Sequence, residues 1–158
     1  LGLAPALGCD QADELRALDA SELGERFACD DLTAVAAAPD GSVALMLGIE
    51  DGLVAAAHNS GQTVIADYAL PDERLTVRWV EGSNVYQGHC ARDSGQAWGL
   101  DERFDAISGH VTVELVPQAD GGVQVSAAFD GLVLETEDDD DEFELAPLTL
   151  DALTIDPA

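Results

Sequence analysis

The chain has 158 residues, enough for one domain that buries roughly 68–70% of its unfolded surface in a single core. It carries 32 acidic residues against 6 basic ones, all of them arginine, and its formal net charge is −26. Such a surface repels phosphate backbones and anionic headgroups, which excludes nucleic-acid or anionic-membrane binding as a main activity. High salt or divalent cations are expected to relieve its self-repulsion.

The composition is that of a globular protein with an aliphatic core, because 47% of the residues are hydrophobic but only 5% are aromatic. No stretch approaches the roughly 18 consecutive apolar residues of a membrane-spanning helix. We therefore expect no membrane-spanning segment.

Residues 1–9 read as the end of an apolar signal segment that runs through small residues into Cys9. Ala6-Leu7-Gly8-Cys9 resembles a bacterial lipobox, in which the cysteine becomes acylated. It keeps the glycine and the cysteine but has Ala6 where leucine is usual and Leu7 where a small residue is usual. The resemblance implies lipidation of Cys9. The alternative is an ordinary apolar leader that packs on the domain.

Three cysteines leave one unpaired in an oxidising compartment, and acylation would remove Cys9 from that count. Cys29 and Cys90 would then form a disulfide, which contributes roughly 4 kcal/mol in the chain-entropy model. This arrangement predicts an extracytoplasmic location. The alternative is three reduced, buried cysteines in a cytosolic protein.

Residues 10–27 are polar, with Leu15, Leu18 and Leu23 near helical spacing, and predict a tether or short helix. A disordered N-terminal segment is the alternative.

From residue 28 to residue 158 we expect a single domain, because short apolar runs alternate with turn residues. Pro39-Asp40-Gly41 and Ala119-Asp120-Gly121-Gly122 are hairpin signals, since glycine supplies positive φ. Residues 53–58 predict a short helix or a crossover segment, and Asp130-Gly131 predicts a bulge. The expected strands are residues 31–38, 42–49, 63–70, 75–81, 104–108, 110–117, 123–137 and 148–155. About eight strands with little helix predict an all-β, two-sheet antiparallel β-sandwich of the Ig-like or jelly-roll-like kind.

Several segments together carry a resemblance: Cys29-Asp30-Asp31-Leu32, Gly82-Ser83-Asn84, Cys90, the strand from Ile107 to Val113, and the Gly121-Gly122 hairpin. This layout resembles uncharacterised bacterial secreted or lipoprotein β-sandwich domains, over about two thirds of the chain. The resemblance implies a sandwich fold, an extracytoplasmic compartment and pairing of an early cysteine with a central one. It implies no activity.

Residues 135–144 contain eight carboxylates in ten positions, and oxygen-rich clusters suit Ca²⁺. Weak calcium binding would use Glu137, Asp138, Asp140 and Glu142. The run lacks the Asp-x-Asp-x-Asp-Gly alternation that wraps an ion, so we favour a solvated acidic hairpin loop. No other cofactor is expected.

We expect no enzyme, because the chain has no nucleophile motif, phosphate-cradling loop or dinucleotide fingerprint. His58, His89 and His110 do not lie at metal-ligand spacing. A carbohydrate hydrolase with an acid pair is a distant third hypothesis, since sugar clefts usually display more aromatics than this chain has.

A small binding surface near Cys90 could use Tyr86, Arg92 and Trp98. The alternative places Trp79 and Trp98 in the core.

These observations predict a non-enzymatic, extracytoplasmic β-sandwich module, lipid-anchored at Cys9, with a binding or structural role. Its membrane contact would come only through the lipid, and its partners would be a second copy or another envelope protein. The alternative is a self-assembling subunit of an extracellular fibre or surface layer. In that hypothesis residues 1–7 add a strand to a neighbour's sheet, and cations screen the acidic surfaces.

Overall fold

The computed structural model describes residues 16–85, 90, 99–137 and 141–156, and the all-β class predicted from the sequence is confirmed. Its elements are β1 (Arg16–Leu18), β2 (Glu25–Cys29), β3 (Thr33–Ala37), β4 (Val43–Ile49), α2 (Leu53–Ser60), β5 (Val64–Leu70), β6 (Leu75–Ser83), β7 (Gly99–Pro117), β8 (Val123–Thr136), β9 (Glu142–Leu145) and β10 (Leu148–Ile155).

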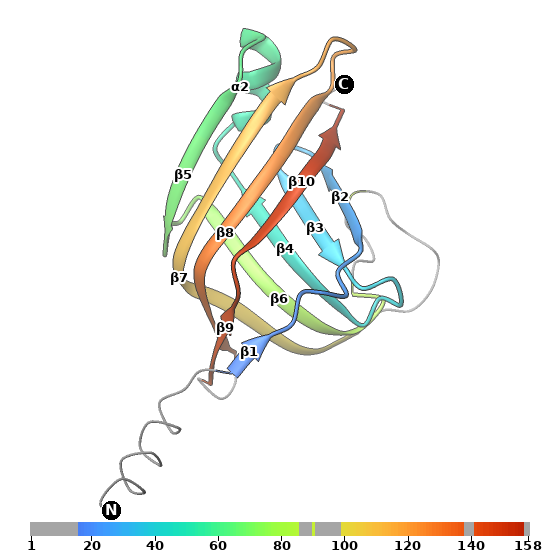
Figure 1. The fold of residues 1–158 in the computed structure, drawn as a ribbon, viewed down its shortest axis with the longest axis vertical. Coiled ribbons are helices and arrows are strands. Elements are labelled where there is room, and N and C mark those ends of the chain that lie inside the picture. The colour runs from blue at the N-terminus through green and yellow to red at the C-terminus, as the bar shows by residue number, and fades with distance from the viewer. Residues whose placement is uncertain (1–15, 86–89, 91–98, 138–140, 157–158) are drawn as a thin grey trace, which may run out of the picture.

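The described strands form one curled sheet (Figure 1) in the order β1-β9-β8-β7-β6-β4-β3-β2. In addition, β5 pairs with β7 and β10 pairs with β8. The β1–β9 pair is parallel, whereas the other ladders are antiparallel. The sheet is therefore mixed.

The two longest strands, β7 and β8, run through both halves of the sheet and hold them together. The first half of β7 pairs with β6, and its second half pairs with β5. Similarly, the first half of β8 pairs with β10 and its second half with β9. The two separate sheets predicted for a sandwich are not confirmed. The paired strands β7 and β8, called the β7–β8 ribbon below, are shared by both halves and make the sheet continuous.

The ribbon bends where Gly109 of β7 meets Gly131 of β8. Their φ values are +119° and +66°, in the region that disfavours residues with a Cβ. A Cβ on Gly109 would lie 2.8 Å from the Gly131 carbonyl oxygen and 2.8 Å from the Leu132 Cα. The ladder shifts register on both sides of Ser108, which confirms the irregularity predicted at Asp130-Gly131.

One apolar core fills the space between the two halves of the curled sheet. Val111, Val113 and Phe129 enter it from the β5–β7–β8–β10 half, and Leu47 and Trp79 enter it from the other half. Trp79 is 2% exposed and its Nε1–H donates to Glu81 at 3.0 Å, so this tryptophan is a core residue.

A second apolar cluster covers the opposite face of β3, β4 and β6. Val35 and Ala37 alternate with Ala34 and Ala36 and so point to the other side of the sheet, yet all four are buried. Val85, which follows β6, packs in this cluster. Strand β3 is thus buried on both faces.

The segment 53–58, for which we predicted a helix or a crossover, lies in helix α2. Gly52 and Gly61 flank it in the left-handed conformation, and the Gly61 N–H donates to the Ala57 carbonyl. Its buried residues, Leu53, Val54 and Ala57, join the core at one end of the sheet. No helix in the described parts of the chain is long and apolar enough to cross a membrane.

Several segments differ from the sequence-based expectations. Residues 16–18 and 25–27, expected in a tether or helix, form β1 beside β9 and part of β2 beside β3. The two strands expected on either side of Gly109 are one continuous β7. The described ends of the acidic run, expected as a solvated hairpin loop, belong to β8 and β9, where Glu135 pairs with Glu142 in the ladder.

The bend predicts a contrast between two strand glycines. Gly109→Ala is expected to cost on the order of 2–4 kcal/mol, because its conformation and the facing backbone both exclude a Cβ. Gly48→Ala, in β4, is the matched control, since a Cβ there meets nothing within 4 Å. We expect its effect to stay within about 1 kcal/mol. Urea unfolding of both variants measures the difference, and equal stabilities would contradict the role of the bend.

Candidate functional site: an acidic depression beside the disulfide

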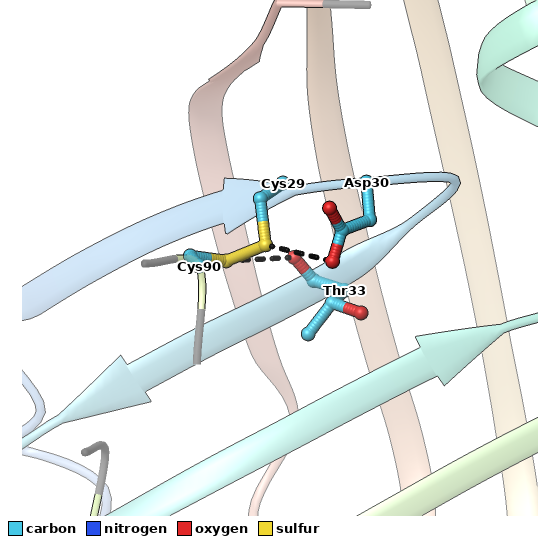
Figure 2. Close-up of a disulfide and its surroundings, with 4 residues drawn as sticks. All are labelled: Cys29, Asp30, Thr33 and Cys90. Carbon is cyan, nitrogen blue, oxygen red and sulfur yellow. Dashed lines mark hydrogen bonds between the residues drawn. A yellow bond between two sulfur atoms is a disulfide. The ribbon is translucent and has the colours of Figure 1, made fainter. Parts of the chain in front are cut away.

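The predicted disulfide between Cys29 and Cys90 is present (Figure 2). Cys29 ends β2, and Asp30 then turns the chain with φ +59°. Cys90 belongs to the connection between β6 and β7 and also has positive φ, at +54°. The disulfide therefore fastens this connection to the β2–β3 hairpin.

Both sulfur atoms lie against oxygen atoms of the hairpin. Cys29 Sγ is 3.5 Å from Asp30 Oδ2, and Cys90 Sγ is 3.9 Å from the Thr33 carbonyl oxygen (Figure 2). A disulfide sulfur carries no proton, so these are polar contacts rather than conventional hydrogen bonds. They place the Asp30 carboxylate directly beside the disulfide.

An open depression of about 380 Å³ adjoins this hairpin. Three of its residues are carboxylates that come from the β2–β3 turn and from the end of β10. The rest come from one face of α2. The full lining is Asp30, Asp31, Val54, Ala55, His58, Asn59 and Asp156.

Backbone groups fix the walls of the depression. The Gly52 N–H, just before α2, donates to Asp31 Oδ2 at 3.2 Å and ties the helix to the hairpin. His58 Nδ1 lies 3.1 Å from the Gly121 carbonyl oxygen. Because a carbonyl only accepts, His58 Nδ1 carries the proton and Nε2 is the acceptor in the neutral ring.

The lining suits cations and repels anions, since it holds three carboxylates and neither arginine nor lysine. Within the described part of the chain, no group of three or more His, Cys, Asp or Glu side chains is placed to hold a metal ion. The arrangement therefore fits ammonium or guanidinium groups, or a hydrated cation, better than a directly coordinated metal.

A second polar cluster lies where β5 turns into β6. Tyr68 Oη donates to Asp51 at 2.8 Å, and Arg74 pairs with Asp72 at 2.7 Å and with Asp51 at 3.4 Å. The Arg74 guanidinium also lies 5.1 Å from the centre of the Tyr68 ring. This cluster links the segment before α2 to both strands.

These contacts change the pKa of Tyr68 and of Asp72, and the hydrogen bond to Asp72 also raises the pKa of Arg74. Burial, together with the hydrogen bond to Asp51, raises the pKa of Tyr68 to about 12. The Arg74 side-chain and backbone hydrogen bonds lower the pKa of Asp72 to about 2. Both shifts favour the observed pairing, with a neutral Tyr68 and an ionised Asp72.

The site residues predicted from the sequence are only partly within the described structure. Tyr86, Arg92 and Trp98, and the lipidation residue Cys9, lie outside the described residues. So do Asp138 and Asp140 of the predicted calcium set.

The two described members of that set have different neighbours. Glu137 lies 3.6 Å from Arg103, which also pairs with Asp105 at 3.2 Å. Glu142 stands directly opposite Glu135 in the β8–β9 ladder. Like charges in that position repel unless a cation or salt screens them.

The acidic depression was not predicted from the sequence. Two sequence features could have pointed to it: Asp30-Asp31 directly after Cys29, and His58-Asn59 at the end of the segment for which a short helix was expected. Asp156, however, reaches the depression only because β10 lies beside β2, a contact between opposite ends of the chain.

Comparisons of this chain with protein-family models, with curated proteins and with solved structures each find no match.

The disulfide predicts a large loss of stability when both cysteines are replaced. In the double variant Cys29→Ser with Cys90→Ser, the free energy of unfolding is expected to be about 4 kcal/mol lower than in the wild type. Without the disulfide, the unfolded chain regains the conformational freedom of a long loop. Guanidinium unfolding without reductant measures this, with Cys9→Ser as the matched control. Equal stability of the double variant and the control would be incompatible with a stabilising disulfide.

The Tyr68 cluster predicts alkaline sensitivity. The pKa of Tyr68 is about 12 in the fold and about 10 when unfolded. Its contribution to stability is therefore complete below pH 10 and is lost as pH rises through 12. Tyr68→Phe should remove this pH dependence and also the high-pKa step from the ultraviolet titration of tyrosine. A wild-type titration in which every tyrosine ionises near pH 10 would contradict the cluster.

Proposed function

We propose that this protein is a non-enzymatic module of the extracytoplasmic cell envelope, lipid-anchored at Cys9, that presents a binding surface to envelope partners. The Cys29–Cys90 disulfide is the observation that carries the proposal. Disulfides form and persist in oxidising compartments and are rare in the cytosol.

The cysteine arrangement supports both parts of this proposal. Cys29 and Cys90 are bonded to each other, so Cys9 is the remaining cysteine of the chain. Cys9 stands in the lipobox-like segment Ala6-Leu7-Gly8-Cys9. Acylation at this position would leave no free thiol in the oxidising compartment.

The placement of β1 supports an anchored orientation. Strand β1 lies beside β9 at the end of the molecule opposite α2 (Figure 1). A lipid on Cys9 would connect to that end through residues 10–15. The acidic depression, which α2 lines, would then face away from the membrane and toward soluble or surface-bound partners.

Charge would keep the anchored domain away from the bilayer surface. The acidic β8–β9 hairpin lies at the β1 end (Figure 1), where it would face the lipid headgroups. Repulsion from anionic lipids acts over a Debye length of about 8–10 Å at physiological salt. The domain would therefore stand off the bilayer, with the acyl chain as its membrane contact.

Unreduced intact and peptide mass spectrometry of the protein from its own cells tests this proposal. We expect an N-terminus at Cys9 carrying acyl mass, together with a linked peptide containing Cys29 and Cys90. An unmodified chain that still contains residues 1–8 would overturn the anchor and favour the fibre or surface-layer alternative. Reduced Cys29 and Cys90 would overturn the extracytoplasmic location.

A further inference from the structure

We propose that the edge of β5 that faces away from β7, called the β5 edge below, is a docking site for an extended segment of a basic partner protein. The segment would add one strand to the sheet, with lysine or arginine on the outer face and apolar side chains toward the core. The proposal goes beyond the envelope role above and depends neither on the anchor at Cys9 nor on the compartment.

The β5 edge is unpaired in the described structure. Among the described strands β5 pairs with β7 alone, and it forms the left margin of the sheet in Figure 1. Its ladder with β7 is regular from Val64 to Leu70, without a bulge, and the strand contains no proline. Such an edge presents backbone N–H and C=O groups to which another strand can bind.

The other margins of the described sheet are short, irregular or covered. Strand β1 has three residues. Strands β2 and β10 contact each other, and β10 has a register shift between Leu150 and Leu153. Natural proteins protect exposed edges in these ways. The seven residues of β5 are therefore the margin best suited to pair with another chain.

The inner face of β5 is only partly covered. Val64, Ala66 and Leu70 pack against the core but remain partly exposed. By contrast, Leu115 and Val113, the partners of Val64 and Ala66 in the ladder with β7, are fully buried. A strand added at the β5 edge would complete this burial if its inward side chains were apolar. Because inward and outward side chains alternate, this predicts apolar residues at every second position of the partner segment.

The outer face beside the β5 edge carries carboxylates but neither arginine nor lysine. Asp67 stands at the middle of β5, and the exposed Glu114 of β7 lies directly opposite the exposed Ile65. The rest of this half of the sheet, formed by β10 and by residues 109–117 and 123–131, also lacks arginine and lysine. The charged side chains of an added strand would therefore meet acids on this face.

This charge distribution selects a basic segment as the occupant. The Asp67 carboxylate is held on the outer face by a hydrogen bond from Thr112 Oγ1 at 2.6 Å, and a cation directly across from it would form a favourable cross-strand pair. Glu114 would lie two strand spacings, about 10 Å, from the added strand, which is close to the Debye length at physiological salt. Arg74, which follows β5, is already paired with two carboxylates. The net charge of −26 also attracts a basic segment and repels an acidic one, such as a second copy of this chain.

Binding of a synthetic peptide to the purified full chain tests the docking site. The probe is a peptide as long as β5 in which lysine and valine alternate, and isothermal titration calorimetry measures its Kd. We expect saturable binding whose Kd rises by about tenfold or more as NaCl is raised from about 0.05 M to about 0.5 M. The same peptide with methylated backbone nitrogens keeps its charge but loses its N–H donors. Its Kd should be about tenfold higher or more, because several backbone hydrogen bonds are lost.

Two charge-reversal variants locate the site. Asp67→Lys should raise the Kd of the lysine–valine peptide by about tenfold or more, because it replaces the facing carboxylate with a like charge. Asp151→Lys is the matched control, since it makes the same change of charge at an exposed position of β10, three strands away from β5. Its effect is expected to stay within about threefold. Circular dichroism of each variant confirms that the fold is retained.

Amide hydrogen exchange followed by NMR identifies the strand that pairs with the peptide. Every second N–H of an edge strand points away from its neighbour in the sheet. We therefore expect slower exchange at alternate amides of Val64–Leu70 when the lysine–valine peptide is bound. The amides of β9 and of the acidic depression should keep their exchange rates.

Several results would overturn the proposal. One is the absence of binding at low salt. Another is binding that backbone methylation leaves unchanged, or that Asp151→Lys weakens as much as Asp67→Lys does, since either indicates general attraction to the acidic surface. Slow exchange at the same amides without peptide would assign the β5 edge to a second copy if the chain is dimeric, and to another segment of the same chain if it is monomeric. None of these results changes the mass-spectrometric test of the anchor.

Discussion

The close approach of Gly109 and Gly131 is the constraint on which this fold depends. The facing backbone leaves no room for a Cβ at Gly109, and both glycines have positive φ. The bend lets β7 and β8 contribute to both halves of the sheet. A straight ribbon would leave two apolar faces without a partner. Once bent, it encloses one core against which α2 packs.

The disulfide and the depression are consequences of that curvature. Because the sheet curls, β10 comes to lie beside β2, and Asp156 lines the same depression as Asp30. Cys29 precedes the turn at Asp30 and fixes the β6–β7 connection to it. The acidic surface at this end is thus built from distant segments, and the covalent link holds one of its walls.

The charge of the molecule is distributed unevenly over this framework. Three of the arginines form ion pairs with carboxylates. Arg74 pairs with Asp72 near Tyr68, and Arg78 and Arg103 both pair with Asp105. Other carboxylates have like-charged neighbours, as Glu135 and Glu142 do in the β8–β9 ladder. The edge strand β5, by contrast, carries one carboxylate, Asp67, among its seven residues.

The sequence by itself determined the features that depend on short-range patterns of residues. Alternation and short apolar runs predicted β3 to β8 and β10, but not β1, β2 or β9. Asp-Gly turns predicted the β3–β4 and β7–β8 hairpins, and the cysteine count predicted the disulfide. The tertiary structure alone decided that β5 pairs with β7, that residues 16–18 join β9, and that Asp156 lines the same depression as Asp31. Periodicity reports which face of a strand is buried, but not which distant strand lies beside it. Those pairings follow from how one bent ribbon buries its apolar faces.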